Sequence, residues 1–234
     1  MVKEELVQRS PVRIFMNSIK GGLGPGELGV IASPSGIGKT SVLVQIALDK
    51  LLQGKKVIHV SFTRHNDYVL TWYEDIFNEI IKKKKLENEH DVKNDIIKNR
   101  VLMRFTQEGM TTEQVLRSLK AMIGDGGFKA DDIIVDGYNF TSAERENISR
   151  VKTFAAEMGI SVWYSCNVQG KEPLFDKRNI PLVIKDYADL FEVVIVMQPK
   201  PDHIMLTVSR DRDTYNPDRP ALKLDPRTLL IMDN

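Results

Sequence analysis

The stretch VIASPSGIGKTSVLVQIAL, residues 30–48, decides how the rest of the chain is interpreted. It opens with apolar residues typical of a buried strand, passes through a loop with two glycines, and continues with apolar residues at helical spacing. Its centre follows the pattern G-x-x-x-x-G-K-S/T of phosphate-binding loops, with Ser33 in place of the first glycine. The stretch therefore predicts a strand, a phosphate-binding loop and a helix, the alternative being a glycine turn before a core helix.

Seven consecutive residues are the predicted phosphate contacts. Backbone N–H groups of a glycine loop and the positive end of the following helix both attract phosphate. Lys39 would neutralise the β and γ oxygens of a nucleotide, and the Thr40 hydroxyl would bind Mg²⁺. Glycine at two positions supplies a positive φ and a close approach of the backbone, and serine at position 33 is small enough to preserve binding. The predicted set is Ser35, Gly36, Ile37, Gly38, Lys39, Thr40 and Ser41.

A carboxylate that orients Mg²⁺ through water is expected where an apolar strand ends. In DIIVDG, residues 132–137, Asp136 follows three apolar residues and meets this description. Because the side chain at the carboxyl end of a parallel strand projects at the sheet edge where ligands bind, we expect Asp136 to lie near Thr40. Asp131 and Asp132 precede the apolar run and are predicted to be turn residues.

Alternating strand and helix patterns predict an α/β fold with a mostly parallel sheet covered by helices on both faces. Antiparallel strands are expected at the C-terminal edge, and residues 167–187 receive no assignment. Residues 1–234 are predicted to form a single domain, with residues 1–20 as an N-terminal extension. The predicted strands are 27–33, 55–62, 100–105, 131–140, 160–166, 190–198, 203–211 and 221–233, and the predicted helices are 39–54, 67–85, 111–124 and 146–159.

Composition excludes several classes of protein. The 33 basic and 32 acidic side chains nearly cancel, so no global field favours nucleic acid or an anionic membrane. A single cysteine excludes an internal disulfide framework, and the 4 histidines show no zinc spacing. No run of eighteen apolar residues and no secretory signal pattern occurs, so the sequence predicts a cytoplasmic protein without membrane insertion.

Four segments together resemble the RecA-type P-loop ATPase superfamily, most nearly its KaiC, RadA and DnaB-helicase branch. They are GGLGPGELGVIASPSGIGKTSVLVQIAL at 21–48, KKVIHVSF at 55–62, DDIIVDG at 131–137 and LTVSRDRD at 206–213. The resemblance implies a RecA-like three-layer α/β/α sandwich that binds ATP and Mg²⁺. It also implies head-to-tail assembly of identical chains into a ring or filament, such as a hexamer.

One departure from this family concerns catalysis. ATP-hydrolysing members usually carry a glutamate at the end of the second strand, where it activates the attacking water. Thr63 occupies that position, and a threonine is no general base at neutral pH, so we expect slow or absent hydrolysis. His65 and Asp67 are the nearby alternatives for this role.

A late strand carries the second family feature. Arg210 and Arg212 match a Lys-x-Arg pair that reaches the γ-phosphate bound by the neighbouring subunit. Residues two apart on a strand share a face, so both guanidinium groups could enter one interface. The alternative is a pair of solvated arginines neutralised by Asp211 and Asp213.

Two further family features match less closely. Asn167 and Gln169 are the nearest candidates for a polar sensor of the γ-phosphate. The loop from residue 170 to 185 corresponds to a region that contacts DNA in recombinases and helicases, and the alternative is a solvated loop. Its basic residues are Lys171, Lys177, Arg178 and Lys185, and Phe175 is the aromatic residue that could stack on a base.

Three functions are consistent with these features. The leading prediction is an ATP-binding switch that controls assembly or regulation with weak hydrolysis. The second is an active ATPase, linked to DNA as a helicase-like or recombinase-like motor, although only about twenty residues precede the glycine turn, where replicative helicases carry a helical domain. The third is a phosphotransferase that acts on a small molecule.

Overall fold

The computed structural model describes residues 11–62, 66–84, 89–106, 109–170, 172–217 and 221–232, with the backbone alone at residues 66, 67, 83 and 84. Its strands form one sheet in the order β3-β2-β4-β5-β1-β6-β7-β8, and β9 also pairs with β7. The strands are β1 (Leu28–Ser33), β2 (Val57–Ser61), β3 (Arg100–Arg104), β4 (Asp132–Asp136), β5 (Ser161–Asn167), β6 (Val193–Pro199), β7 (Ile204–Asp211), β8 (Thr214–Tyr215) and β9 (Leu222–Leu224).

Strand directions follow the predicted α/β class. Strands β1 to β6 pair in parallel, whereas β7 is antiparallel to β6, β8 and β9. The structure therefore confirms a mostly parallel sheet with antiparallel strands added beside β6. Strands β2 and β3 come between β1 and β4 in the sequence, while β5 alone separates β1 from β4 in the sheet.

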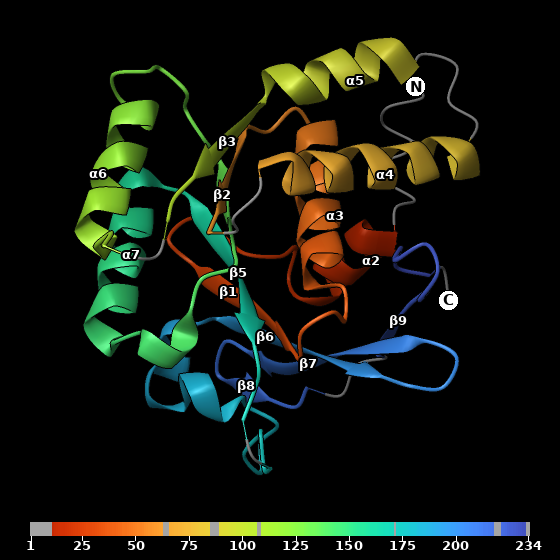
Figure 1. Cartoon of the computed structure of the whole chain (residues 1–234), viewed down its shortest axis with the longest axis vertical. Coiled ribbons are helices and arrows are strands. Elements are labelled where there is room, and N and C mark those ends of the chain that lie inside the picture. The colour runs from red at the N-terminus through yellow and green to blue at the C-terminus, as the bar shows by residue number, and fades with distance from the viewer. Residues whose placement is uncertain are drawn as a thin grey trace.

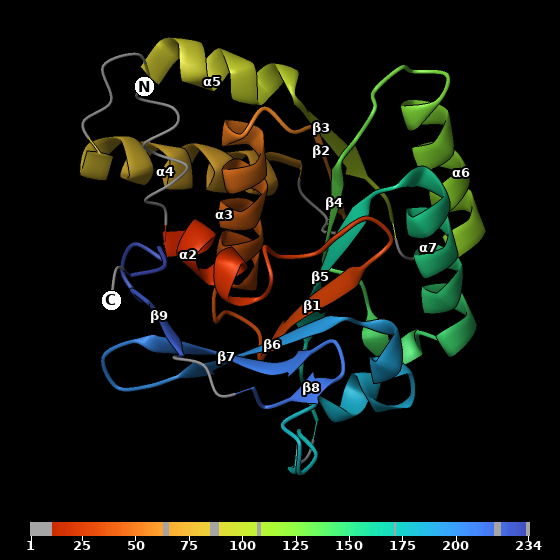
Figure 2. The same ribbon diagram turned by 180° about the vertical axis from the view of Figure 1, so that it is seen from behind.

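Helices cover both faces of this sheet (Figures 1 and 2). One face is covered by α2 (Pro11–Ser18), α3 (Lys39–Leu52), α4 (Asn66–Lys84) and α5 (Glu89–Lys98), and the other by α6 (Thr112–Ile123) and α7 (Arg145–Met158). Two short 3-10 segments, η1 (Phe140–Ser142) and η2 (Leu182–Leu190), follow β4 and β5.

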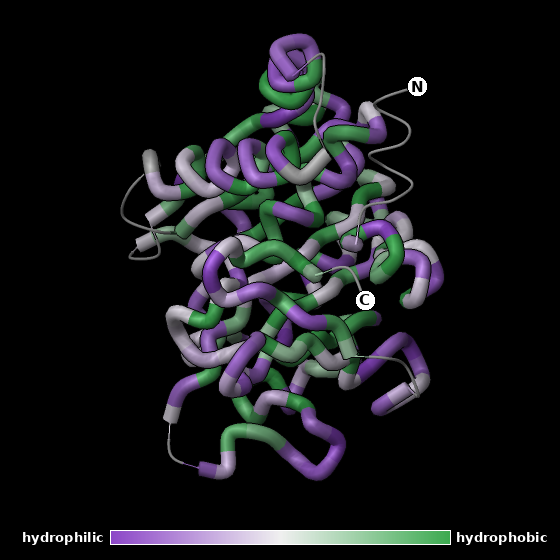
Figure 3. The backbone as a smooth tube through the Cα atoms, turned by 90° about the vertical axis from the view of Figure 1, so that its right-hand side faces the viewer, coloured by the Kyte–Doolittle hydropathy of each residue, from purple (hydrophilic) through white to green (hydrophobic). Residues whose placement is uncertain are grey.

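Each helical layer buries its own apolar cluster against the sheet. The first cluster joins residues of α2 to α5 with Ile31, Ile134 and Trp163 of the strands, and the second joins α6 and α7 with Val30 and Ile133. Neighbouring residues of β1 and of β4 thus enter opposite clusters, because alternate side chains of a strand point to opposite faces. Figure 3 shows the hydrophobic stretches, in green, toward the centre and hydrophilic stretches, in purple, in outer loops and helices.

The N-terminal part of the chain contains a helix that was not predicted. Within the predicted extension of residues 1–20, α2 packs Val12, Phe15 and Met16 into the first cluster. Their spacing of three and four residues places them on one helical face. Arg13 of the same helix also pairs with the buried Asp49 of α3 at 2.9 Å, so α2 is attached to α3 by an ion pair as well as by apolar contacts.

Other departures are local. Helix α5 and segment η2 lie where no regular element was predicted, and the strand expected over 221–233 is reduced to β9. Residues 226–228 form a turn instead, in which the Asp225 carboxylate accepts a hydrogen bond from the Arg227 N–H at 2.7 Å. Asp132 is the first residue of β4 rather than a turn residue, and it pairs with Lys50 at 3.1 Å.

Candidate functional site

The loop between β1 and α3 depends on two glycines with positive φ. Gly36 has φ of 79° and Gly38 has φ of 96°, a region that residues with a Cβ seldom adopt. A Cβ at Gly38 would also lie 3.3 Å from a methyl carbon of Leu224, whereas a Cβ at Gly36 would meet no atom within 4 Å. Gly38 is the N-cap of α3 and has no side chain to cap it, so the first N–H groups of this helix suit an anionic ligand.

The Lys39 side chain folds back over this loop. Its Nζ donates hydrogen bonds to the backbone oxygens of Ser33 at 3.0 Å and Pro34 at 2.8 Å, and to the Ser33 hydroxyl at 3.2 Å. Burial lowers the pKa of the Lys39 ammonium, while Cys166 and Asp136 act in the opposite direction. A phosphate oxygen would replace neutral acceptors with a charged one, which forms the stronger hydrogen bond.

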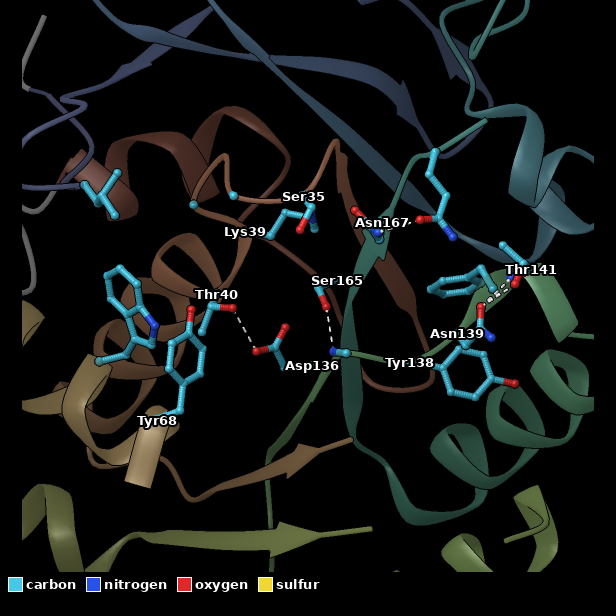
Figure 4. A pocket seen from close by; sticks show the side chains of 17 residues that line it. Ser35, Lys39, Thr40, Tyr68, Asp136, Tyr138, Asn139, Thr141, Ser165 and Asn167 are labelled. Atoms are coloured by element: carbon cyan, nitrogen blue, oxygen red, sulfur yellow. Dashed lines mark hydrogen bonds between the residues drawn. The ribbon is translucent and has the colours of Figure 1, made fainter. Parts of the chain in front are cut away.

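Thr40 and Asp136 meet across 96 positions of sequence. The Thr40 hydroxyl donates a hydrogen bond to the Asp136 carboxylate at 2.9 Å, and Asp136 is buried at the end of β4 (Figure 4). A hydroxyl that donates its proton in this way keeps its lone pairs for a cation. In the described part of the chain no group of three His, Cys, Asp or Glu could hold a metal ion. One hydroxyl beside one carboxylate suits Mg²⁺, which keeps several waters and takes further oxygens from phosphates.

These residues open into a cavity of about 510 Å³. Figure 4 shows Tyr68 of α4 beside Thr40, with Asn139 and Thr141 on the other side of Asp136. The Gly137 N–H donates a hydrogen bond to the Ser165 hydroxyl at 2.9 Å, and this bond joins the ends of β4 and β5 beside the cavity. The lining residues are Ser35, Gly36, Gly38, Lys39, Thr40, Tyr68, Trp72, Asp136, Gly137, Tyr138, Asn139, Phe140, Thr141, Ser165, Asn167, Gln169 and Leu229.

Two members of the predicted set of seven do not line this cavity. Ile37 packs against the first apolar cluster. Ser41 is buried, and its hydroxyl donates a hydrogen bond to the backbone oxygen of Leu229 at 2.6 Å. The other five line the cavity together with Asp136, so the structure brings the predicted loop and the predicted carboxylate into one site.

Several lining residues were not predicted. Tyr138, Asn139 and Ser165 lie at the carboxyl ends of β4 and β5, and the rule that ligands bind at this edge of a parallel sheet could have found them. Tyr68 and Trp72 reach the cavity from α4, and Leu229 reaches it from the C-terminal segment. For these three residues the sequence carries no local signal.

Arg210 is bound within its own chain. Its guanidinium donates hydrogen bonds to the backbone oxygens of Phe191 at 2.8 Å and Arg212 at 2.7 Å, and to that of Ala188. The residue is buried and does not line the cavity. The alternative of a solvated arginine is therefore wrong for Arg210, whose Nε and Nη1 groups already donate to backbone oxygens of its own chain.

Arg212 is likewise engaged. Its guanidinium pairs with Glu27 at 2.6 Å and Asp211 at 2.6 Å, and it donates to the backbone oxygen of Gly22 at 3.0 Å. Strand β7 ends at Asp211, and Arg212 has φ of 55°, so the two arginines do not continue one strand face as expected. Their trans-acting role stays a prediction.

The remaining candidates divide between described and undescribed residues. Thr63, His65, Lys171 and the side chain of Asp67 lie outside the described residues. Asn167 lines the cavity, and its Oδ1 is buried without a hydrogen-bond partner among the described residues. The exposed basic residues of the loop are Lys177, Arg178 and Lys185, and Arg178 lies 4.6 Å from the ring centre of Tyr215.

No protein-family model matches the chain, and a search of curated proteins finds no match. No helix in the described ranges has the length and apolar character needed to cross a membrane. The family resemblance thus stays a prediction from the sequence, and the function has to be argued from the geometry of the cavity.

Proposed function

We propose that this protein binds ATP and Mg²⁺ in the cavity between the β1–α3 loop and the ends of β4 and β5. The observation that carries the proposal is the Thr40–Asp136 hydrogen bond of 2.9 Å beside Lys39 and the uncapped start of α3. These groups supply a cation, helix N–H groups, a hydroxyl and a carboxylate at one place, which are the components that a Mg²⁺-bound triphosphate requires.

The two ends of the cavity suit different parts of a nucleotide. Tyr68 lies beside Thr40, and the ring centre of Trp72 is 6.1 Å from that of Tyr68, so both offer aromatic faces on which a base can stack. Asn139, Thr141 and Asn167 lie beyond Asp136 and offer hydrogen-bonding groups to the terminal phosphate. The choice of ATP over other nucleotides follows the sequence resemblance to RecA-type ATPases.

Calorimetry with Mg²⁺ and ATP tests the binding. Lys39→Ala should weaken binding about tenfold to a hundredfold, since it removes a charge-assisted contact to phosphate. Lys200→Ala, in an exposed turn between β6 and β7, is the matched control and should leave affinity unchanged. Equal affinities of wild type and Lys39→Ala would refute the placement of the phosphates.

We infer a switch in assembly or regulation rather than rapid hydrolysis. Among the described residues that line the cavity, Asp136 alone carries a carboxylate and none is a histidine, so they supply no second group to accept a proton from water. Phosphate release should therefore be slow with or without single-stranded DNA. Thr63→Glu, which restores the acidic residue of the family, should accelerate it.

The rival function is an active ATPase or DNA-linked motor. It is favoured by the exposed basic residues between 177 and 185, and rapid phosphate release stimulated by DNA would establish it in place of the switch. Sizing with and without Mg²⁺-ATP tests the assembly step. A chain that stays monomeric with bound ATP at high concentration would exclude assembly as the output of the switch.

A further inference from the structure

The C-terminal segment, residues 225–232, is fastened to the first turns of α3. The backbone oxygen of Leu229 accepts hydrogen bonds from the Ser41 hydroxyl at 2.6 Å and from the Gln45 side-chain amide at 2.8 Å. The Gln45 side-chain oxygen accepts a third from the Ile231 N–H at 2.9 Å. Ser41 and Gln45 are four residues apart, so they share one helical face, and both are buried.

This attachment holds a backbone conformation that is unfavourable by itself. Leu229 has φ of 56°, a region that costs a residue with a Cβ about 1–2 kcal/mol. The segment closes on itself as well, since the Leu229 N–H donates to the Asp225 oxygen at 2.8 Å and the Asp225 N–H donates to the Leu230 oxygen at 2.9 Å. An unfavourable conformation persists only where surrounding contacts determine it, and it gathers at functional sites.

The fastened residue is also part of the cavity. The Leu229 side chain lines it, and one of its methyl carbons lies 3.5 Å from where a Cβ on Gly38 would stand. Trp72, another lining residue, packs with Leu229 against the same apolar cluster. An apolar side chain at this place has no favourable contact to offer a triphosphate, whereas it can cover the sugar or the base of a nucleotide.

We propose that Ser41 and Gln45 are positioning residues that hold Leu229 as the nucleoside-facing wall of the cavity, and so link the C-terminal segment to nucleotide binding. The inference rests on the proposed function and names residues outside the phosphate contacts. Nucleotide binding and attachment of the segment affect each other reciprocally. A nucleotide that contacts Leu229 therefore stabilises the attached segment, and loss of the attachment lowers the affinity for the nucleotide.

A comparison of two ligands separates this wall from the phosphate site. Titrations with Mg²⁺-ATP and with Mg²⁺ and inorganic tripolyphosphate are made on the full chain and on Leu229→Ala. The substitution should lower the affinity for ATP about tenfold, since it removes apolar contact with the nucleoside. The affinity for tripolyphosphate should stay unchanged. Met232→Ala, on the same segment and outside the cavity lining, is the control and should change neither affinity.

Hydrogen exchange tests the attachment without any ligand. Gln45→Met keeps the volume and removes the two hydrogen bonds that the Gln45 side chain makes to the C-terminal segment. The Ile231 N–H should therefore exchange at least about tenfold faster than in wild type. Gln53→Met, at the exposed residue that follows α3, is the matched control and should leave that rate unchanged. In wild type, saturating Mg²⁺-ATP should slow exchange at Ile231, and tripolyphosphate should not.

The outcomes distinguish the two proposals. A wild-type chain that binds neither ligand removes the proposed function and this inference with it. If the wild-type chain binds both ligands and Leu229→Ala binds ATP with the affinity of wild type, the role of Leu229 as a nucleoside contact is refuted and the proposed function stands. An unchanged Ile231 rate in Gln45→Met overturns the attachment alone, and equal slowing by ATP and tripolyphosphate overturns the contact between Leu229 and the nucleoside.

Discussion

The buried Asp49 of α3, which pairs with Arg13 of α2, predicts an unusual dependence of the free energy of unfolding on pH. Burial raises the pKa of the Asp49 carboxyl from 3.8 to about 6, and Arg13 and Lys50 oppose this effect only in part. Gln53 donates to one carboxylate oxygen at 3.1 Å, and the other oxygen has no hydrogen-bond partner in the described part of the chain. The nearby charge of Asp132 adds to the increase.

The sign of the effect follows from proton binding. Between pH 3.8 and about 6 the folded chain holds a proton on Asp49 that the unfolded chain has released. The stabilisation from this carboxyl is therefore complete below the lower value and is lost as the pH rises through the upper one. At 1.36 kcal/mol for each pH unit, the loss amounts to about 3 kcal/mol.

Asp49→Asn isolates this contribution from those of the other acidic residues. The free energy of unfolding is measured by urea denaturation from pH 4 to pH 7.5 for wild type and variant. The variant should gain about 3 kcal/mol relative to wild type across this range, because its amide cannot ionise. A constant difference, or a gain by wild type as the pH rises, would refute the view that burial dominates over the Arg13 pair.

The remaining predictions concern the cavity and its supports. Asp136→Asn should abolish the dependence of ATP affinity on Mg²⁺ in calorimetry, and Thr40→Val should reduce it, because each removes a group beside the cation. Arg212→Ala should lower the free energy of unfolding by about 2 kcal/mol in urea denaturation, since it removes the ion pairs of this guanidinium with Glu27 and Asp211. Gly38→Ala should cost about 1–3 kcal/mol in the same assay and more than Gly36→Ala, because its Cβ would also contact neighbouring side chains.

The sequence predicts best what depends on local patterns. The phosphate-binding loop is specified by residues within one strand, one turn and one helix, and the end of β4 by a run of apolar residues followed by Asp136. Parallel pairing then brings their ends to the same edge of the sheet. This is why a contact between Thr40 and Asp136 could be expected although 96 positions separate the two residues.

Features that depend on packing between distant segments could not be predicted in this way. The approach of Tyr68 to the cavity depends on how α4 lies on the sheet, and no neighbour in sequence determines that. Arg212 matched a family pattern, yet its partner Glu27 is 185 positions away, and its φ of 55° ends the strand face on which the prediction relied. Helix α2 had a signal in the spacing of Val12, Phe15 and Met16, but a helix of eight residues is too short for periodicity alone to establish.

Three consecutive residues at the start of α3 illustrate how a helix distributes neighbouring side chains among different tasks. Lys39 bonds to the loop, Thr40 to Asp136, and Ser41 to the C-terminal segment. Successive helical positions differ by about 100° in direction, so the three reach three different elements from one turn. A bound triphosphate has to replace the partners of Lys39, can add to those of Thr40, and has no need to disturb that of Ser41. Changes at position 39 should therefore alter the affinity for phosphate, whereas changes at position 41 should alter how Leu229 is held against the nucleoside.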